Sequence, residues 1–146
     1  MKIGMGSDHG GYELKEFIRE YLETEKYEVV DYGTYSTESV DYPDYGEKVA
    51  NAVVGGEVEV GIIMCGTGLG ISMAASKVKG IRAAVVSEEY SARMAKVHNN
   101  ANILAMGGRV VGKDLAKSIV DAYLNAEFEG GRHQRRIDKI MNIENR

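Results

Sequence analysis

The sequence predicts an α/β fold in which helices cover both faces of a five-stranded parallel sheet. Short apolar strand segments alternate with amphipathic helical segments five times along the 146 residues, which is typical of such a sheet. Proline occurs once and glycines gather where the strands are expected to end, so neither a disordered nor a collagen-like chain is indicated. A chain of this length has the usual size of one domain. We therefore expect a single domain over residues 1–146.

Five segments have the composition of strands. Each is short, apolar and rich in β-branched or aromatic residues, and each leads into a turn or a polar segment. They cover residues 2–7, 27–32, 59–65, 81–86 and 103–106.

The segments between these strands carry apolar residues at helical spacing. The first of them contains Leu14, Phe17, Ile18, Tyr21 and Leu22. Pro43 suits the first turn of the second helix, the third helix is expected over 71–77, and Met64 and Met73 are expected in the core. A further helix is expected within 130–144. Together the elements predict a Rossmann-like three-layer α-β-α sandwich with an extra C-terminal helix.

Composition argues against several classes of function. A net charge of -4 is unlike that of nucleic-acid binders, which usually carry a basic face. No apolar run approaches the ~20 residues of a membrane helix, and no signal segment precedes the first strand. The single cysteine allows no intrachain disulfide, and with the scattered histidines it gives no zinc spacing. We expect a cytoplasmic protein without nucleic-acid, membrane or metal partners.

The turn after the third strand is the most informative segment. Ligands of such sheets bind beyond the carboxyl ends of the strands, where Cys65 is followed by glycines at 66, 68 and 70. These glycines let the backbone approach a ligand, and the following helix N-terminus presents unpaired N–H groups to an anion and favours a thiolate. A free cysteine is also common as a small buried residue. A dinucleotide fingerprint fits the glycine spacing poorly, and Ile71 stands where a cysteine phosphatase needs arginine.

Other polar residues suit a phosphate site. Asp8 and His9 follow the first strand, although Asp8 is also a typical helix cap. Arg132 and Arg136 share one helix face and can fork onto a phosphate, or form a solvated basic helix end. His98 lies at the opposite end of the sheet from the cysteine. It is therefore either a surface residue or part of a neighbouring subunit's site, and the second option predicts an obligate dimer.

Five motifs occur in a characteristic order. They are SDHGG at 7–11, SVDYPD at 39–44, CGTGLG at 65–70, HNNAN at 98–102 and GRHQRR at 131–136. In this order they resemble the type B ribose-5-phosphate isomerases, a family that includes galactose-6-phosphate isomerase subunits and allose-6-phosphate isomerases. The resemblance covers essentially the whole chain.

The resemblance implies an aldose–ketose isomerase that needs no cofactor and interconverts ribose 5-phosphate and ribulose 5-phosphate. Cys65 would move a proton between C1 and C2 through a cis-enediol(ate), and His98 with Thr67 would open the furanose ring. Some members of the family carry a glutamate base instead of the cysteine. The substrate-binding residues implied for this chain are Asp8, His9, Gly66, Gly68, Gly70, Asn99, Arg109, Arg132 and Arg136.

The resemblance also implies a homodimer with shared active sites, or a tetramer of two dimers. Two other functions remain open, namely isomerisation of a hexose 6-phosphate such as allose or galactose 6-phosphate, and non-catalytic phosphate binding. Tyr42 is not among the expected catalytic residues, because its segment is equally typical of an ordinary surface loop.

Overall fold

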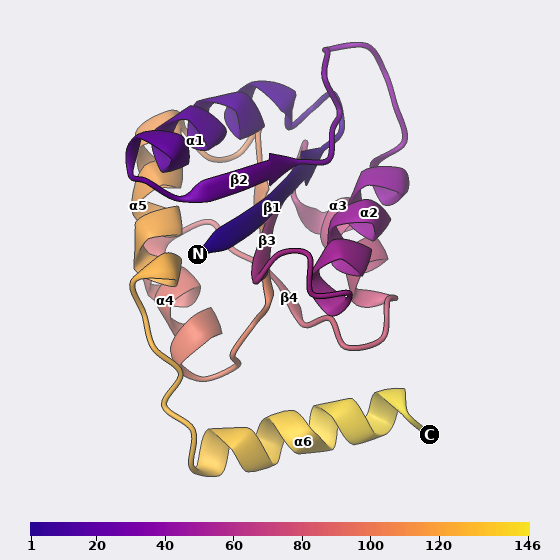
Figure 1. Cartoon of the computed structure of the whole chain (residues 1–146), viewed down its shortest axis with the longest axis vertical. Helices are drawn as coiled ribbons and strands as arrows, with labels where there is room; N and C mark the ends of the chain where they lie inside the picture. The colour runs from indigo at the N-terminus through magenta and orange to yellow at the C-terminus, as the bar shows by residue number, and fades with distance from the viewer.

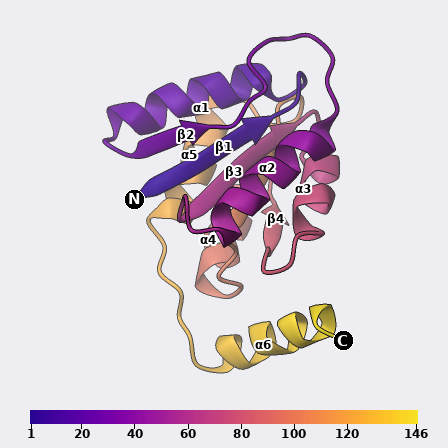
Figure 2. The same cartoon turned by 45° about the vertical axis from the view of Figure 1, so that its right-hand side comes forward.

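The computed structural model describes residues 1–146 as a parallel sheet between two layers of helices, with one further helix set apart (Figure 1 and Figure 2). The strands are β1 (Lys2–Ser7), β2 (Glu28–Asp31), β3 (Val60–Cys65), β4 (Ala83–Val85) and β5 (Ile103–Gly107). The helices are α1 (Tyr12–Thr24), α2 (Tyr42–Val54), α3 (Leu69–Ser76), α4 (Glu89–Val97), α5 (Lys113–Leu124) and α6 (Arg132–Glu144). The predicted fold class is confirmed, including the extra C-terminal helix.

The order of the strands brings three strand ends together. The sheet runs β2-β1-β3-β5-β4 with every pair parallel. Cys65 at the end of β3 pairs with Gly107 at the end of β5, and Gly61 near the start of β3 pairs with Ile103. The turns after β1, β3 and β5 therefore share one end of the sheet, whereas the α4–β5 connection lies at the other end.

Each face of the sheet has its own core. Successive strand residues point to opposite faces, so Ile62 packs with Ile18 of α1 and Ile119 of α5, while Ile63 packs with Val49 of α2. Helices α1, α4 and α5 cover the first face, and α2 and α3 cover the second, as Figure 1 shows. Cys65 belongs to the core under α2 and α3.

The ends of several elements differ from the predicted ones. The strand predicted over 81–86 is paired only over Ala83–Val85, although Ile81 and Val86 are buried. The N–H of Val86 still donates to the carbonyl of Ala105 in β5 at 3.0 Å. The apolar character of Ile81 and Val86 therefore indicates burial in the core, and the strand itself is shorter. Helix α3 begins at Leu69 and not at residue 71, which places its N-terminus closer to Cys65.

The two methionines expected in the core have different environments. Met64 is fully buried, but Met73 is 66% exposed on α3, so the prediction for Met73 is wrong. No helix combines the length and the apolar character needed to cross a membrane.

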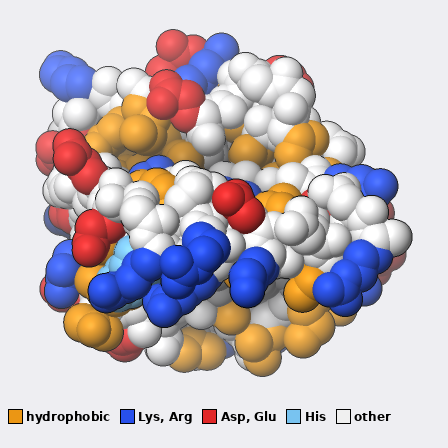
Figure 3. All heavy atoms as spheres, turned by 90° about the horizontal axis from the view of Figure 1, so that it is seen from below, with side chains coloured by type: hydrophobic (Ala, Val, Ile, Leu, Met, Phe, Trp, Pro, Cys, Tyr) orange, Lys and Arg blue, Asp and Glu red, His pale blue; other side chains and the backbone are white.

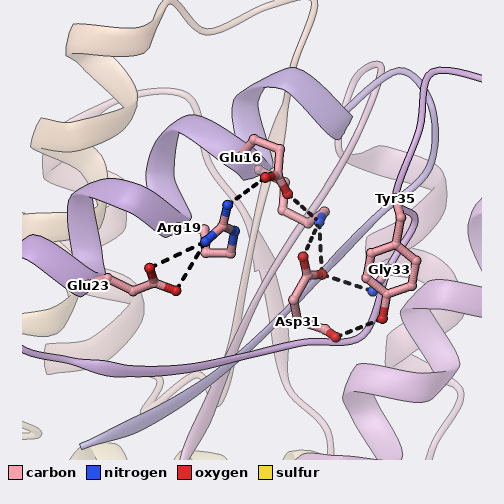
Figure 4. A network of polar contacts seen from close by, with 7 residues as sticks. Glu16, Arg19, Glu23, Asp31, Gly33 and Tyr35 are labelled. Carbon is pink, nitrogen blue, oxygen red and sulfur yellow. Dashed lines mark hydrogen bonds and ion pairs between the residues drawn. The ribbon is translucent and has the colours of Figure 1, made fainter.

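A buried ion pair joins α1 to β2 and to the loop that follows β2 (Figure 4). The side chain of Lys15 is fully buried, and its Nζ lies 2.7 and 2.8 Å from the carboxylate oxygens of Asp31 and 3.0 Å from Glu16. The Asp31 carboxylate also accepts the N–H of Gly33 at 2.9 Å, and its backbone carbonyl accepts the hydroxyl of Tyr35. The network therefore fixes the start of the loop that leads to α2.

Replacing Lys15 with methionine keeps the length of the side chain but leaves Asp31 without its cation. We expect Lys15→Met to lower the free energy of unfolding by about 3 kcal/mol in urea denaturation, because a partly buried charge loses its partner. Lys2→Met is the control, since the ion pair of Lys2 with Glu28 is exposed on both sides and should contribute less than about 1 kcal/mol. Equal losses in the two variants would contradict this account.

Candidate active site

Cys65 lies where β3 turns into α3. The residue is 4% exposed, and its Sγ accepts a hydrogen bond from the N–H of Gly68 at 3.2 Å. Gly68 has a φ of 82°, a conformation that favours glycine. A Cβ at this position would also lie 2.8 Å from the carbonyl carbon of Met106. Glycine is therefore needed at position 68 to place an N–H group against the thiol.

The turns after β1, β3 and β5 pack backbone against backbone. A Cβ on Gly108 would lie 2.5 Å from the carbonyl oxygen of Gly10, and a Cβ on Gly10 would lie 3.1 Å from the nitrogen of Gly66. The N–H of Gly108 donates to the carbonyl of Cys65 at 2.8 Å, and the N–H of Arg109 donates to that of Gly66 at 3.0 Å. These contacts fix the positions of the three turns relative to one another at the end of the sheet.

A cleft of about 310 Å³ opens beside the thiol. Its lining residues are Asp8, Tyr42, Cys65, Gly66, Thr67, Gly70 and Arg109. Asp8 is buried, and one of its carboxylate oxygens accepts the N–H groups of Gly10 and Gly11 at 2.9 and 3.2 Å. The guanidinium of Arg109 lies over Gly66, with one nitrogen 3.0 Å from the position of a Cβ there. The cleft thus combines a thiol, a carboxylate and a cation.

His9 is held by the loop after β2. Its Nδ1 accepts the N–H of Val40 at 3.2 Å, so Nδ1 carries no proton in this arrangement. The neutral ring then has its proton on Nε2, which is the tautomer that donates a hydrogen bond to an anion.

A second group of predicted site residues lies at the other end of the sheet. A separate cavity of about 320 Å³ is lined there by His98, Asn99, Arg132, His133, Arg136, Ile137 and Ile140. Because β5 begins only after this group and ends opposite Cys65, roughly 13 Å of strand separates the two groups. Figure 3, which views the molecule from the side of α6, shows a band of Lys and Arg side chains beside a histidine.

Two histidines of this second group stack on each other. The ring centroids of His98 and His133 lie 4.1 Å apart with an interplanar angle of 12°. One carboxylate oxygen of Glu129 lies 4.0 Å from the Nε2 of His98, and the other lies 4.0 Å from the Nε2 of His133. Burial, together with the neighbouring His98, lowers the pKa of His133, which favours the neutral form of its ring.

Arg82 holds the segment that carries His98 and Asn99. Its guanidinium donates to the carbonyls of Asn99 at 3.2 Å and Asn100 at 2.8 Å, and it contacts the Sδ of Met141 on α6 at 3.5 Å. The side chain of Asn102 accepts the backbone N–H of Arg82 at 2.8 Å. Sequence reasoning missed Arg82, and the only available signal was the asparagine-rich motif that it contacts.

The structure therefore divides the predicted site residues into two groups. Asp8, His9, Cys65, Gly66, Thr67, Gly68, Gly70 and Arg109 lie in or beside the cleft, while His98, Asn99, Arg132 and Arg136 lie at the other cavity. Tyr42, which the sequence did not place among the catalytic residues, lines the cleft, and its ring lies 2.5 Å from the position of a Cβ on Gly70. Its place beside Pro43, at the start of α2, was the signal that could have found it.

A thiol at the carboxyl end of a parallel sheet, beside a glycine turn and an arginine, defines an α/β protein with a cleft at the end of the sheet where such folds bind their ligands. The chain belongs to the Ribose/Galactose Isomerase family, which it matches over residues 3–140. This confirms the resemblance seen in the motifs.

Similar proteins span the whole chain. It is 56% identical to ribose-5-phosphate isomerase B of Escherichia coli (strain K12), over 99% of this chain and 97% of that protein. The structure of ribose-5-phosphate isomerase B from Clostridium thermocellum matches with a TM-score of 0.99 and 63% identity, covering 99% of this chain and 98% of that one. The enzyme from Mycoplasma genitalium, solved with bound ribulose-5-phosphate, matches with a TM-score of 0.94 and 46% identity, covering 99% and 96%.

Gly68 and Gly56 allow the glycine turn to be tested, since both have positive φ but only Gly68 has neighbours that a methyl group would meet. Gly56→Ala should cost about 1 kcal/mol of unfolding free energy, from the strained backbone alone. We expect Gly68→Ala to cost about 3 kcal/mol or more, because overlap with Met106 adds to that strain. Thermal unfolding of both variants measures the difference. A Gly68→Ala variant as stable as Gly56→Ala would contradict the close packing of the turns.

Proposed function

We propose that the chain is an aldose–ketose isomerase that interconverts ribose 5-phosphate and ribulose 5-phosphate, with Cys65 as the base. The observation that carries the proposal is the thiol of Cys65, which accepts the N–H of Gly68 in a cleft that also contains Asp8 and Arg109. A donated N–H at a helix N-terminus stabilises a thiolate. The substrate is supported by the family and by the names of the similar proteins.

The reaction moves protons and changes no net oxidation state of the substrate. The thiolate of Cys65 removes the proton on C2 of the open-chain aldose, and the electron pair moves toward the C1 carbonyl to give an enediolate. The thiol then returns a proton to C1. The proton of the C2 hydroxyl passes to the oxyanion on O1, so that C2 becomes the carbonyl and C1 the hydroxymethyl group of the ketose. Such a transfer requires a base, an acid and a means of holding the anion, and it consumes no external oxidant or reductant.

Backbone donors at the start of α3 stabilise the enediolate oxygens. The first N–H groups of a helix have no partner within the helix. At the start of α3 those of Gly68 and Leu69 donate to the side chains of Cys65 and Thr67, which leaves the N–H of Gly70, a residue that lines the cleft, for the substrate. A fixed donor of this kind contributes about 2.7–4 kcal/mol to transition-state stabilisation. Asp8, which is held by two backbone N–H groups, binds the sugar hydroxyls.

Opening of the furanose ring requires a group that the cleft of one chain lacks. His98, with Thr67, opens the ring, and Asn99 binds a sugar hydroxyl, but His98 and Asn99 lie at the opposite end of the sheet from the cleft. A twofold axis perpendicular to the strands turns the partner's sheet end over end. This rotation places His98, Asn99, Arg132 and Arg136 of one chain beside the cleft of the other chain.

The phosphate is held between the two chains. Arg132 and Arg136 of one chain face His9 and Arg109 of the other, and these four side chains donate hydrogen bonds to the phosphate oxygens.

The surface beside β4 provides the contact for this homodimer. β4 is an edge strand with no outer neighbour, and α3 packs against it. Val85 on β4, and Leu69 and Met73 on α3, are exposed apolar side chains, Met73 at 66%. Unpaired strand edges and grouped apolar side chains are usually covered by other protein. In a dimer formed through this surface, the twofold axis perpendicular to the strands relates the two active sites. Two such dimers can form a tetramer.

The function is tested by following ribose 5-phosphate conversion by the purified protein, beside Cys65→Ala. We expect turnover by the wild type and a loss of about 10³-fold in kcat for the variant, since a positioned base contributes 10²–10⁴. Circular dichroism of the variant controls for folding. Equal turnover by both proteins would show that another residue is the base. If the protein converts allose or galactose 6-phosphate but not ribose 5-phosphate, the substrate is a hexose 6-phosphate. If it binds phosphate but converts no sugar phosphate, the protein is a non-catalytic binding module.

The dimer is tested by placing a charge on the proposed contact surface. We expect sedimentation to give a dimer for the wild type and a monomer with greatly reduced turnover for Met73→Glu, because the buried carboxylate is unpaired in the interface. Leu115→Glu changes an exposed apolar residue on α5, away from β4, and should leave the dimer intact. A wild-type monomer that is fully active, or an unaffected Met73→Glu dimer, would contradict the proposed contact.

A further inference from the structure

Three possible metal ligands lie close together beside the second cavity, and two of them, His98 and His133, line it. One ligand atom each of His98, Glu129 and His133 can be chosen so that all three lie within 4.8 Å of one another. Two imidazoles and a carboxylate, with a position left open, are a ligand set that Zn²⁺ uses in proteins. Sequence spacing did not reveal this set, because the ligands come from the end of α4, the loop before α6 and the start of α6.

The backbone holds these ligands in place while two of the side chains can adjust. The N–H of Glu129 donates to the carbonyl of Val97 at 3.0 Å, and the N–H of His98 donates to that of Met94 at 2.9 Å. Ligand atoms around a tetrahedral Zn²⁺ lie about 3.3 Å apart, so the 4.0 Å separations must shorten and His98 must turn out of its stack. The side chains of Glu129 and His98 are 60% and 39% exposed, which permits both movements.

An independent observation points to a ligand here. His133 is only 7% exposed, and its Nε2 atom is buried without any hydrogen-bond partner. Buried polar atoms in proteins are nearly always paired. A metal ion bound between His133 and Glu129 would give this nitrogen a partner. The distance of 4.0 Å to the nearest Glu129 oxygen is too long for a hydrogen bond, so the carboxylate does not already satisfy it.

We propose that His98, Glu129 and His133 form a site for a divalent metal ion of the Zn²⁺ class, which inhibits the enzyme by occupying His98. Imidazole and carboxylate together favour Zn²⁺, Ni²⁺ or Cu²⁺ over Mg²⁺ or Ca²⁺. Arg132 and Arg136 line the same cavity and repel the ion, so binding is reversible and not that of a structural zinc site. The binding itself is independent of the isomerase activity, whereas the inhibition rests on the proposed role of His98.

The binding is tested without substrate, by calorimetric titration of the intact protein with ZnCl₂ at pH 7.5. We expect one ion per chain in the wild type and at least about tenfold weaker binding in Glu129→Gln. Glu127→Gln is the matched control, since Glu127 is an exposed carboxylate two residues away and should bind as the wild type does. His133→Asn should abolish metal binding. Because His133 is buried, that variant could fail to fold, and the Glu129→Gln variant, changed at an exposed position, then still tests the site.

Cysteine thiolates are also ligands of Zn²⁺, and Co²⁺ distinguishes binding at the proposed site from binding at Cys65. We expect the Co²⁺ complex to show d–d bands without a thiolate-to-cobalt charge-transfer band, and Cys65→Ser to bind like the wild type. Absence of binding, a charge-transfer band, or equal affinity of Glu129→Gln and Glu127→Gln would each overturn the site. In turnover assays, Glu129→Gln should need about tenfold more Zn²⁺ than Glu127→Gln for half inhibition. Normal metal binding without inhibition would overturn only the role assigned to His98.

Discussion

The close packing of three backbone turns determines where every group of the cleft lies. The turns after β1, β3 and β5 contact each other through Gly10, Gly66 and Gly108, with no room for a side chain between them. Hydrogen bonds from the third turn to the second reinforce this contact. A carboxylate, a thiol and a guanidinium are therefore carried by one rigid backbone unit. A parallel sheet makes this arrangement possible, since every turn from a strand into the following helix lies at the same end of the sheet.

The fold and the cleft were largely predictable, because their signals are local. Apolar strands, glycines after each strand and Pro43 at a helix start are all visible in neighbouring residues. The residues around Cys65 were predicted together because they follow strands of the same sheet. The strand around residues 81–86 was predicted too long, since burial and strand pairing give the same apolar signal.

The remaining features depend on contacts between distant segments, which a single sequence does not reveal. Arg82 holds carbonyl groups seventeen and eighteen residues away, and Lys15 pairs with Asp31 across two elements. Met73 was expected in the core because its side chain is apolar, and nothing in the neighbouring residues indicates that it is exposed on α3. The grouping of Glu129 with two histidines required the loop before α6, whose path has no strong sequence signal.

The distance between the two groups of site residues is the reason to regard one chain as an incomplete enzyme. The sheet itself separates Cys65 from His98, and no small rearrangement can move a residue from one end of a strand to the other. An antiparallel arrangement of two sheets removes the separation without any change in the fold. It also explains why α6, which lies apart from the layers in Figure 1, carries exposed arginines.

Mixing two inactive variants tests this account most directly. Cys65→Ala and His98→Ala are each expected to be nearly inactive as homodimers. After unfolding and refolding together in equal amounts, half of the dimers are mixed, and each mixed dimer has one site with both residues intact. The account predicts recovery of about a quarter of wild-type turnover. If the refolded mixture stays as inactive as either variant alone, while the wild type refolds to full turnover, Cys65 and His98 do not act in a site shared between two chains.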